Sequence, residues 1–167
     1  AKIIGTDPKT DRIVHERTGN PSVFLSADLS RDGHFLVLSK DHGWSSTDLY
    51  LRDLRKAPRG KAPPATTSKD FLSFAVGKEA HYGVEAYKDH LYVMSDDGAP
   101  RYRVFRVDPA NLARDKWKEI IPERADATLD SYRVAGGRLV LSYLKNASSL
   151  VEIRELDGTL VRELPLP

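Results

Sequence analysis

The chain has 167 residues, of which 40% are hydrophobic and 30% are charged, and its formal net charge is +2. This composition is typical of a folded domain and excludes a disordered chain, and no apolar run approaches the roughly 20 residues of a membrane-spanning helix. The small net charge argues against a nucleic-acid-binding protein, and the absence of cysteine excludes disulfides and thiolate metal sites.

Alternating hydrophobic residues, many of them β-branched or aromatic, predict strands along almost the whole chain. In residues 21–80 we predict a first unit of four strands, at 23–29, 34–39, 48–54 and 71–76. The segment from Ser30 to Gly33 forms the turn between the first two strands. The Pro-rich stretch 56–68 is predicted to be an extended loop within this unit rather than a linker between domains.

The same pattern of strands recurs twice. The second unit, residues 81–125, is predicted to hold strands at 84–87, 90–95, 101–107 and 117–121, with a helical turn over 108–114. The third unit, residues 126–167, holds strands at 130–134 and 138–146, followed by further strand pattern from 149 to 167. Gly33, Gly136 and Gly137 stand where tight hairpins require a positive φ, which glycine adopts without steric cost.

Two sets of residues align across the three units: Ser39, Ser95 and Ser142 in the second strand, and Arg52, Arg106 and Arg154 in the third. Their separations within the units are 13, 11 and 12 residues. A four-stranded pattern that recurs at about fifty residues predicts propeller blades. We therefore predict an all-β fold, a partial β-propeller of about three four-stranded antiparallel blades. The arginines are expected to lie over blade surfaces or to pair with acidic side chains of neighbouring strands.

Residues 1–20 contain one additional strand pattern, from Arg12 to Glu16. In phase with the later units, this segment corresponds to the outer strand of a preceding blade. Because a domain that begins with a single strand of a blade is unusual, we expect the chain to be a piece of a larger propeller.

Five segments in the same order carry a resemblance to a known family: 5–8, 28–33, 98–104, 117–123 and 137–167. Together they resemble the propeller of a prolyl oligopeptidase, a serine peptidase, in its bacterial form. The resemblance implies a ring of about seven blades that caps an α/β-hydrolase domain, and that second domain cleaves short peptides after proline with a Ser-Asp-His triad. The chain is similar to the central three blades of such a ring, plus one flanking strand.

The resemblance also implies which partners the chain has. The chain is expected to contact the α/β-hydrolase domain and the remaining blades, to gate access to the active site, and to line part of it for proline-containing oligopeptides. Nucleic acid and membrane partners are not expected. Members of the family occur in the cytoplasm and in the periplasm, and we expect the cytoplasm here, with the periplasm as the alternative.

Catalytic and metal-binding patterns are not found in the sequence. A hydrolase nucleophile needs a G-x-S-x-G elbow, and the run from Gly43 to Thr47 matches only its first three positions. The histidines are five in number: His15, His34, His42, His81 and His90. None has a recognisable Ser and Asp partner in sequence, and no metal-ligand spacing appears. Asp96 to Gly98 is interpreted as a tight turn. We therefore predict no catalytic residue, no metal site and no cofactor within this chain.

Two residues receive a functional interpretation from the resemblance. Positions that match Phe24 and Trp44 contribute apolar surface near the acyl side of the substrate in members of the family. Phe24 begins the first strand of its unit, and Trp44 lies in the loop after the second strand. For Phe24 the alternative is plain core packing, and for Trp44 it is an exposed loop aromatic without a role.

The sequence is also compatible with a function of a different class. The chain could be a stand-alone, propeller-like binding module that completes its ring by self-association. End blades without neighbours expose apolar faces, and unpaired edge strands add a template for pairing. In that case the isolated chain is expected to dimerise, to close on itself or to aggregate.

Overall fold

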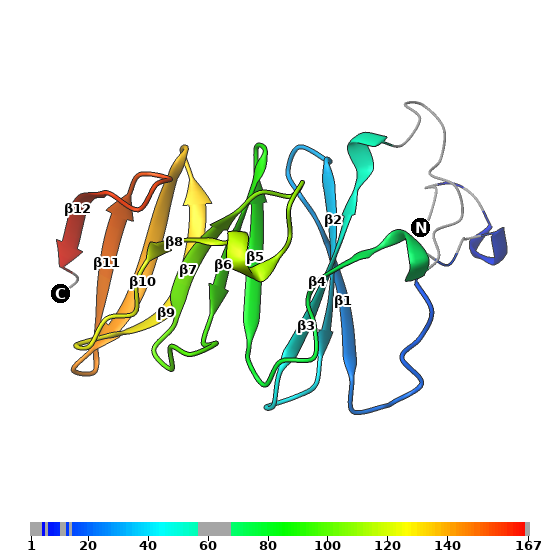
Figure 1. Ribbon diagram of the computed structural model, residues 1–167, viewed down its shortest axis with the longest axis horizontal. Helices are drawn as coiled ribbons and strands as arrows, with labels where there is room; N and C mark the ends of the chain where they lie inside the picture. The colour runs from blue at the N-terminus through cyan, green and yellow to red at the C-terminus, as the bar shows by residue number, and fades with distance from the viewer. Residues whose placement is uncertain (1–4, 6, 11–12, 14, 57–67, 166–167) are drawn as a thin grey trace.

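The computed structural model describes residues 5, 7–10, 13, 15–56 and 68–165. Over these residues the chain forms three four-stranded antiparallel sheets, each built from consecutive strands. The sheets stack face to face like leaves of a book, with the first at one end of the stack and the third at the other (Figure 1). The predicted all-β fold with three blades is therefore confirmed.

Blade 1 contains the strands β1 (Phe24–Leu29), β2 (Phe35–Asp41), β3 (Thr47–Asp53) and β4 (Leu72–Ala75), paired in that order. Three short 3-10 helices accompany it: η1 (Pro8–Thr10), η2 (Leu54–Lys56) and η3 (Ser68–Asp70). All four strands overlap the predicted ones. Most of the predicted Pro-rich loop, residues 57–67, lies outside the described residues.

Blade 2 contains β5 (Tyr82–Tyr87), β6 (His90–Ser95), β7 (Arg103–Val107) and β8 (Lys118–Ile121). The predicted helical turn is shifted toward the C-terminus. Asp108 accepts a hydrogen bond from the backbone N–H of Ala110 at 2.8 Å and so forms an Asx turn, and the 3-10 helix η4 (Arg114–Lys116) follows four residues after Ala110.

Blade 3 contains β9 (Thr128–Ala135), β10 (Arg138–Lys145), β11 (Ser148–Arg154) and β12 (Leu160–Pro165). Gly136 and Gly137 connect β9 to β10 with φ values of +57° and +76°. Both glycines of the two-residue hairpin therefore have the positive φ that the sequence predicts for a tight hairpin, as in a type I′ turn.

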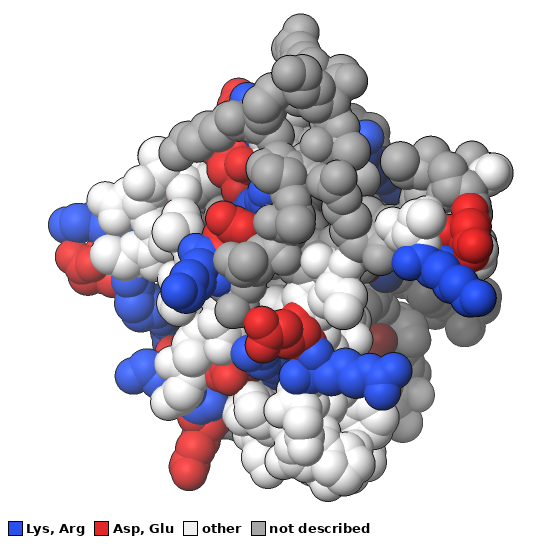
Figure 2. Space-filling model, turned by 90° about the vertical axis from the view of Figure 1, so that its right-hand side faces the viewer, with Lys and Arg blue, Asp and Glu red and all other residues white. Residues whose placement is uncertain are grey.

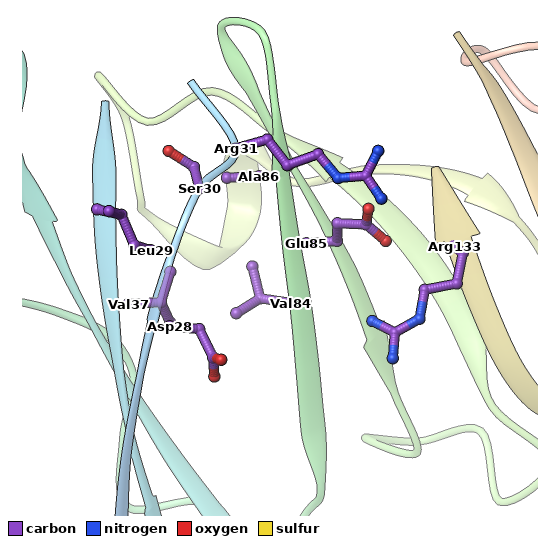
Figure 3. Close-up of a pocket in the computed structure, with 9 residues that line it drawn as sticks. All are labelled: Asp28, Leu29, Ser30, Arg31, Val37, Val84, Glu85, Ala86 and Arg133. Atoms are coloured by element: carbon purple, nitrogen blue, oxygen red, sulfur yellow. The ribbon is translucent and has the colours of Figure 1, made fainter. Parts of the chain in front are cut away.

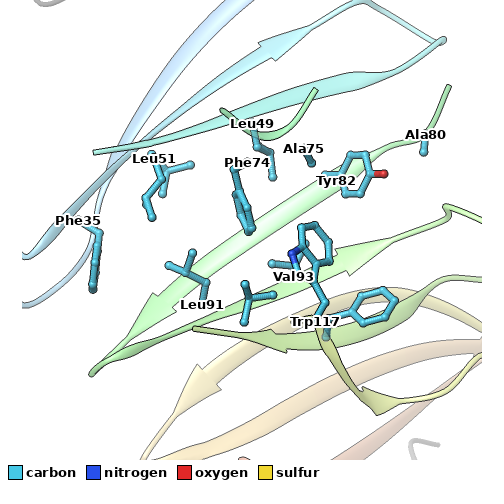
Figure 4. Close-up of a cluster of buried hydrophobic side chains, with 13 residues drawn as sticks. Phe35, Leu49, Leu51, Phe74, Ala75, Ala80, Tyr82, Leu91, Val93 and Trp117 are labelled. Carbon is cyan, nitrogen blue, oxygen red and sulfur yellow. The ribbon is translucent and has the colours of Figure 1, made fainter. Parts of the chain in front are cut away.

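Two hydrophobic cores lie between the blades, one in each seam. The blade 1–2 core contains buried residues from both sheets (Figure 4): Phe35, Val37, Leu49, Leu51, Phe74, Ala75, Ala80, Tyr82, Leu91, Val93, Phe105, Val107 and Trp117. The blade 2–3 core is formed by Tyr92, Val104, Ile120, Ile121, Ala127, Leu129, Tyr132, Val134, Leu139, Leu141, Tyr143 and Leu150. Successive residues of a strand point to opposite faces, so blade 2 supplies side chains to both cores.

The predicted alignment of the serines is wrong in blade 2. Ser39 lies on the face of its strand that points to the following blade, together with Val37. The residues on either side of Ser142, Leu141 and Tyr143, belong to the blade 2–3 core, so Ser142 points away from blade 2. It therefore occupies the same face of its blade as Ser39. Ser95 instead shares the face of Val93 and points back to blade 1. A one-residue offset moves a side chain to the opposite face, so alignment by residue type placed blade 2 out of phase.

The aligned arginines show the same offset. Arg52 and Arg154 lie on the face of their blade that points back toward the preceding blade. Arg106 pairs with Tyr92 and lies on the opposite face, which points toward blade 3. Arg154 donates to Glu152 Oε2 at 2.7 Å and to the carbonyl of Gly158 at 2.7 Å. This arginine therefore pairs with an acidic residue as predicted, but the acid belongs to its own strand.

The predicted strand from Arg12 to Glu16 is not formed in the residues that can be described. Arg12 and Val14 lie outside the described residues, and Ile13, His15 and Glu16 are not in a strand. The ring of His15 instead packs against Phe71 of blade 1 in a T-shaped arrangement with centroids 6.0 Å apart. A strand needs a partner for its backbone hydrogen bonds, and none of the described strands pairs with this segment. In the described residues, no helix is long and apolar enough to cross a membrane.

Candidate functional site

The two predicted substrate-lining residues lie at the same end of blade 1. Phe24 begins β1 and pairs with Asp41, the last residue of β2. The β2–β3 hairpin follows at once and is closed by a hydrogen bond from the backbone N–H of His42 to the carbonyl of Ser46 at 2.9 Å. Trp44 occupies the tip of this hairpin. The register of blade 1 therefore brings Phe24 close to the hairpin that carries Trp44.

Both aromatic side chains face solvent in this chain. Phe24 is 66% exposed and Trp44 is fully exposed. The core-packing interpretation of Phe24 is therefore wrong, because the first strand of blade 2 does not cover this face of β1. The lining of a substrate site by the two residues stays a prediction. Two exposed aromatic rings at one end of a blade form an apolar surface that a ligand or another domain can cover.

The hairpin that carries Trp44 is fastened by a histidine–aspartate pair. His42 Nε2 lies 2.9 Å from Asp48 Oδ2, and Asp48 Oδ1 accepts a hydrogen bond from the backbone N–H of Gly77 at 2.8 Å. Gly77 belongs to the segment that leads into blade 2. A single carboxylate thus joins the base of the hairpin to the blade 1–2 connection.

A second histidine–aspartate pair lies in blade 2. His81 Nδ1 is 2.8 Å from Asp96 Oδ2, and Asp96 Oδ1 accepts from the backbone N–H of His81 at 2.6 Å. The sequence did not predict either pair, because their members are 6 and 15 residues apart and are brought together only by the β2–β3 and β5–β6 pairing. In the described part of the chain, neither imidazole hydrogen-bonds to a Ser or Thr hydroxyl. Both pairs are therefore hydrogen-bonded contacts that hold connecting segments in place.

The turn predicted at Asp96 to Gly98 is confirmed. The N–H of Ala99 donates to the carbonyl of Asp96 at 2.9 Å, and Gly98 has a φ of +65°. The next carboxylate, Asp97, accepts from the Tyr82 hydroxyl at 3.1 Å. Burial, with a further contribution from the charge of Asp97, raises the pKa of Tyr82 to about 12.

A cavity of about 420 Å³ lies between β1 and β5, the first strands of blades 1 and 2. Figure 3 shows its lining: Asp28, Leu29, Ser30, Arg31, Val37, Val84, Glu85, Ala86 and Arg133. Its floor is apolar and its rim carries charges of both signs. The side chains of Arg31 and Arg133 lie around that of Glu85, whose Oε2 accepts from the backbone N–H of Val134 at 3.0 Å. Neither guanidinium forms an ion pair or hydrogen bond with another described residue.

The described residues contain no group of three or more His, Cys, Asp or Glu side chains placed to hold a metal ion. The end of the stack that carries blade 1 shows acidic and basic side chains intermixed, without a field of one sign (Figure 2). The described part of this face therefore shows no basic patch of the kind that binds polyanions.

Comparison with known proteins gives a consistent result. The family model described as the N-terminal beta-propeller domain of prolyl oligopeptidase matches residues 1–167. The prolyl endopeptidase of Elizabethkingia miricola is 28% identical over 98% of this chain, and that of Elizabethkingia meningoseptica is 25% identical over 98%. In both cases the chain covers 22% of the relative, so it spans about a fifth of the length of these proteins.

Solved structures agree with these matches. A prolyl endopeptidase from a study of inter-domain dynamics in catalysis and specificity is 46% identical, with a TM-score of 0.88 over 99% of this chain and 23% of that one. Prolyl oligopeptidase B from Galerina marginata, bound to a 35mer hydrolysis and macrocyclization substrate, has a TM-score of 0.81 at 22% identity over 96% of this chain and 22% of that one. The second likeness shows the shared fold.

Proposed function

Because the chain belongs to the family of N-terminal β-propeller domains of prolyl oligopeptidases, we propose that it gates and partly lines the active site of a proline-specific serine oligopeptidase. In this proposal the propeller lies over an α/β-hydrolase domain that hydrolyses short peptides after proline. The chain itself supplies no catalytic group. The relatives named prolyl endopeptidase are several times longer than this chain, which supports a second domain in the protein as a whole.

The observation that carries the proposal is the exposed aromatic pair at one end of blade 1. Phe24 begins β1, and Trp44 lies at the tip of the neighbouring hairpin, whose base is joined by His42 and Asp48. Large apolar side chains that are solvent-exposed at one edge of a sheet are expected to be covered by another domain or by a ligand. We propose that they face the catalytic domain and form part of the apolar surface beside the acyl side of the substrate.

The experiment measures peptide hydrolysis with proline before a chromogenic leaving group. In the full-length protein, Phe24→Ala and Trp44→Ala are expected to raise KM by about tenfold for peptides with an apolar acyl side, because each removes one apolar contact. The value of kcat should change little, since the bond-breaking groups lie elsewhere. Peptides shortened to a single residue before proline should show no such increase.

Two controls make the outcome decisive. Leu160→Ala removes an exposed apolar side chain of the opposite end blade and should leave KM unchanged. The rigorously purified 167-residue chain should give no turnover. Turnover by this chain, or unchanged KM in both aromatic variants, would contradict the proposal.

Self-association is the second candidate, and the end blades favour it. Leu29 is 61% exposed on the face of blade 1 that looks away from blade 2, and Leu144 is 53% exposed on the face of blade 3 that looks away from blade 2. Apolar faces at both ends of a stack permit head-to-tail contacts between copies. Light scattering of the isolated chain should then show dimers or larger species. A stable monomer at high concentration would exclude this alternative.

A further inference from the structure

The strand β1 differs from the other first strands of the blades in its exposure. All six residues of β1 are exposed, whereas β5 has one buried and five half-buried residues, and β9 has three buried ones. Part of this exposure belongs to the face that looks away from blade 2. However, Phe24, Ser26 and Asp28 lie on the face that looks toward blade 2 and are exposed as well. The two first strands therefore stand apart here, and the cavity described above fills the space between them.

One edge of β1 also has no hydrogen-bonding partner among the described strands. The sheet order places β1 at the edge of blade 1, with β2 as its single neighbour. The N–H of Ser30 donates to the carbonyl of Phe35 at 2.9 Å, which fixes the phase of the antiparallel ladder. Because hydrogen-bonded and non-hydrogen-bonded pairs alternate, the N–H and C=O groups of Leu25, Ala27 and Leu29 point to the free edge.

We propose that the free edge of β1 binds an extended oligopeptide by β-strand addition. This inference rests on the proposed function for the class of ligand, a peptide. The backbone of the peptide would pair with Leu25, Ala27 and Leu29. Alternate side chains of the added strand would enter the cavity between β1 and β5. In this mode of recognition the main-chain hydrogen bonds supply affinity, and the pocket for alternate side chains supplies selectivity.

The cavity defines the side chain that fits. A peptide residue opposite Asp28 lies above the apolar floor formed by Val37 and Val84. The rim carries two charges of each sign, from Asp28, Glu85, Arg31 and Arg133. A β-branched aliphatic side chain is short enough to bury its methyl groups against the two valines and to leave these charges in water. We therefore assign the bound segment as an extended strand with Val, Ile or Thr at alternate positions.

The test uses the 167-residue chain and the peptide acetyl-Thr-Val-Thr-Val-Thr-Pro-amide, with binding followed by NMR titration. Two forms of the peptide carry N-methyl groups on alternate amides, one set on the odd positions and one on the even. Only one set of amides can face β1. We expect one methylated peptide to lose binding and the other to keep it, with shift changes centred on β1 and β5. Equal binding of both forms would overturn the proposal, as would shift changes elsewhere.

A protein variant provides the matching test. Ala27→Pro removes one N–H that points to the free edge, at a site where an edge strand tolerates proline. We expect its Kd to rise about fivefold, the value of one lost hydrogen bond, while Ala27→Thr keeps the affinity of the parent. Amide exchange of β2 checks that blade 1 stays folded, and the methylated peptides remain decisive if it does not.

The outcomes separate this proposal from the proposed function. Peptide binding at β1 is measured without turnover, so it can hold even if Phe24→Ala and Trp44→Ala leave KM unchanged. Conversely, those variants can raise KM while the free edge binds nothing, and that would overturn the β1 proposal alone. Concentration-dependent shifts of β1 without peptide would show that a second copy occupies the edge, which also overturns it.

Discussion

Both seams contain an apolar core, but in the described residues no hydrogen bond or ion pair joins the first strands of blades 1 and 2, whereas hydrogen bonds join the first strands of blades 2 and 3. Blades 1 and 2 are instead linked farther from β1, for example by the ion pair of Arg55 with Asp89 at 3.0 Å. In the first seam, Trp117 is the centre. Its ring lies 5.0 Å from that of Phe74, 5.6 Å from Phe105 and 6.2 Å from Tyr82, measured between centroids. Its indole N–H donates to the carbonyl of Leu112 at 3.0 Å. Tyr82 belongs to the first strand of blade 2, but none of these rings belongs to β1, the first strand of blade 1.

The second seam is held at the first strands as well. The Tyr132 hydroxyl of β9 lies 2.5 Å from the carbonyl of Tyr92 and 3.3 Å from that of Gly83 in β5. The N–H of Val134 donates to Glu85. Farther out, the buried Glu152 carboxylate is held between two arginines, Arg124 and Arg154.

The difference explains where the cavity lies. Directional bonds from β9 to β5 close the blade 2–3 seam next to the first strands, and no such bond joins β1 to β5 in the described residues. A seam whose contacts lie away from β1 leaves room beside this strand. The exposure of the face of β1 that looks toward blade 2 is therefore a consequence of how blade 1 is attached.

The largest expected effect comes from removing the aromatic centre of the first seam. Trp117→Ala should lower the free energy of unfolding by about 3–5 kcal/mol, because a large buried side chain leaves a cavity. Urea denaturation measures the change. Trp44→Ala is the matched control, since this indole is fully exposed and its loss should change stability by less than about 0.5 kcal/mol. Equal losses in the two variants would contradict the role assigned to Trp117.

A smaller effect is expected from removing the directional contact of the second seam. Tyr132→Phe should cost about 1–3 kcal/mol, because it deletes a buried hydroxyl that bonds across the seam. Tyr143→Phe is its control. The Tyr143 hydroxyl is buried in the same core, with no hydrogen-bond partner in the described part of the chain, so its removal should be neutral or slightly stabilising. A loss for Tyr143→Phe as large as that for Tyr132→Phe would show that packing, not the hydrogen bond, joins blades 2 and 3.

The smallest effect concerns pH. Burial and Asp97 raise the pKa of Tyr82 to about 12, so the folded state holds this proton more tightly than the unfolded state. The resulting contribution to stability is complete below the unfolded pKa of about 10 and is lost as the pH rises through about 12. Tyr82→Phe should therefore reduce the fall of the unfolding free energy over this range. Denaturant titrations at several alkaline pH values measure the slope, and parallel curves for the two proteins would refute the assignment.

Much of the fold could be predicted from the sequence because it depends on local pattern. Alternating residues predict strands, and the strand His90–Ser95 was predicted with its bounds as observed. Turn residues such as Gly136 and Gly137 predict the hairpins. The phase of blade 2 was wrong because the alternation of Leu91 and Tyr92 has the same appearance whichever blade each faces. Only the packing of the neighbouring sheets distinguishes the two.

For the candidate site too, the sequence determined one part and the tertiary structure another. By itself, the sequence determined that the chain forms three four-stranded units, and it indicated Phe24 and Trp44 as aromatics of interest. The exposure of Phe24, the pairs of His42 with Asp48 and of His81 with Asp96, and the free edge of β1 were decided by the tertiary structure. The physical reason is that strand formation depends on neighbours along the chain, whereas exposure and pairing depend on how far one blade stands from the next.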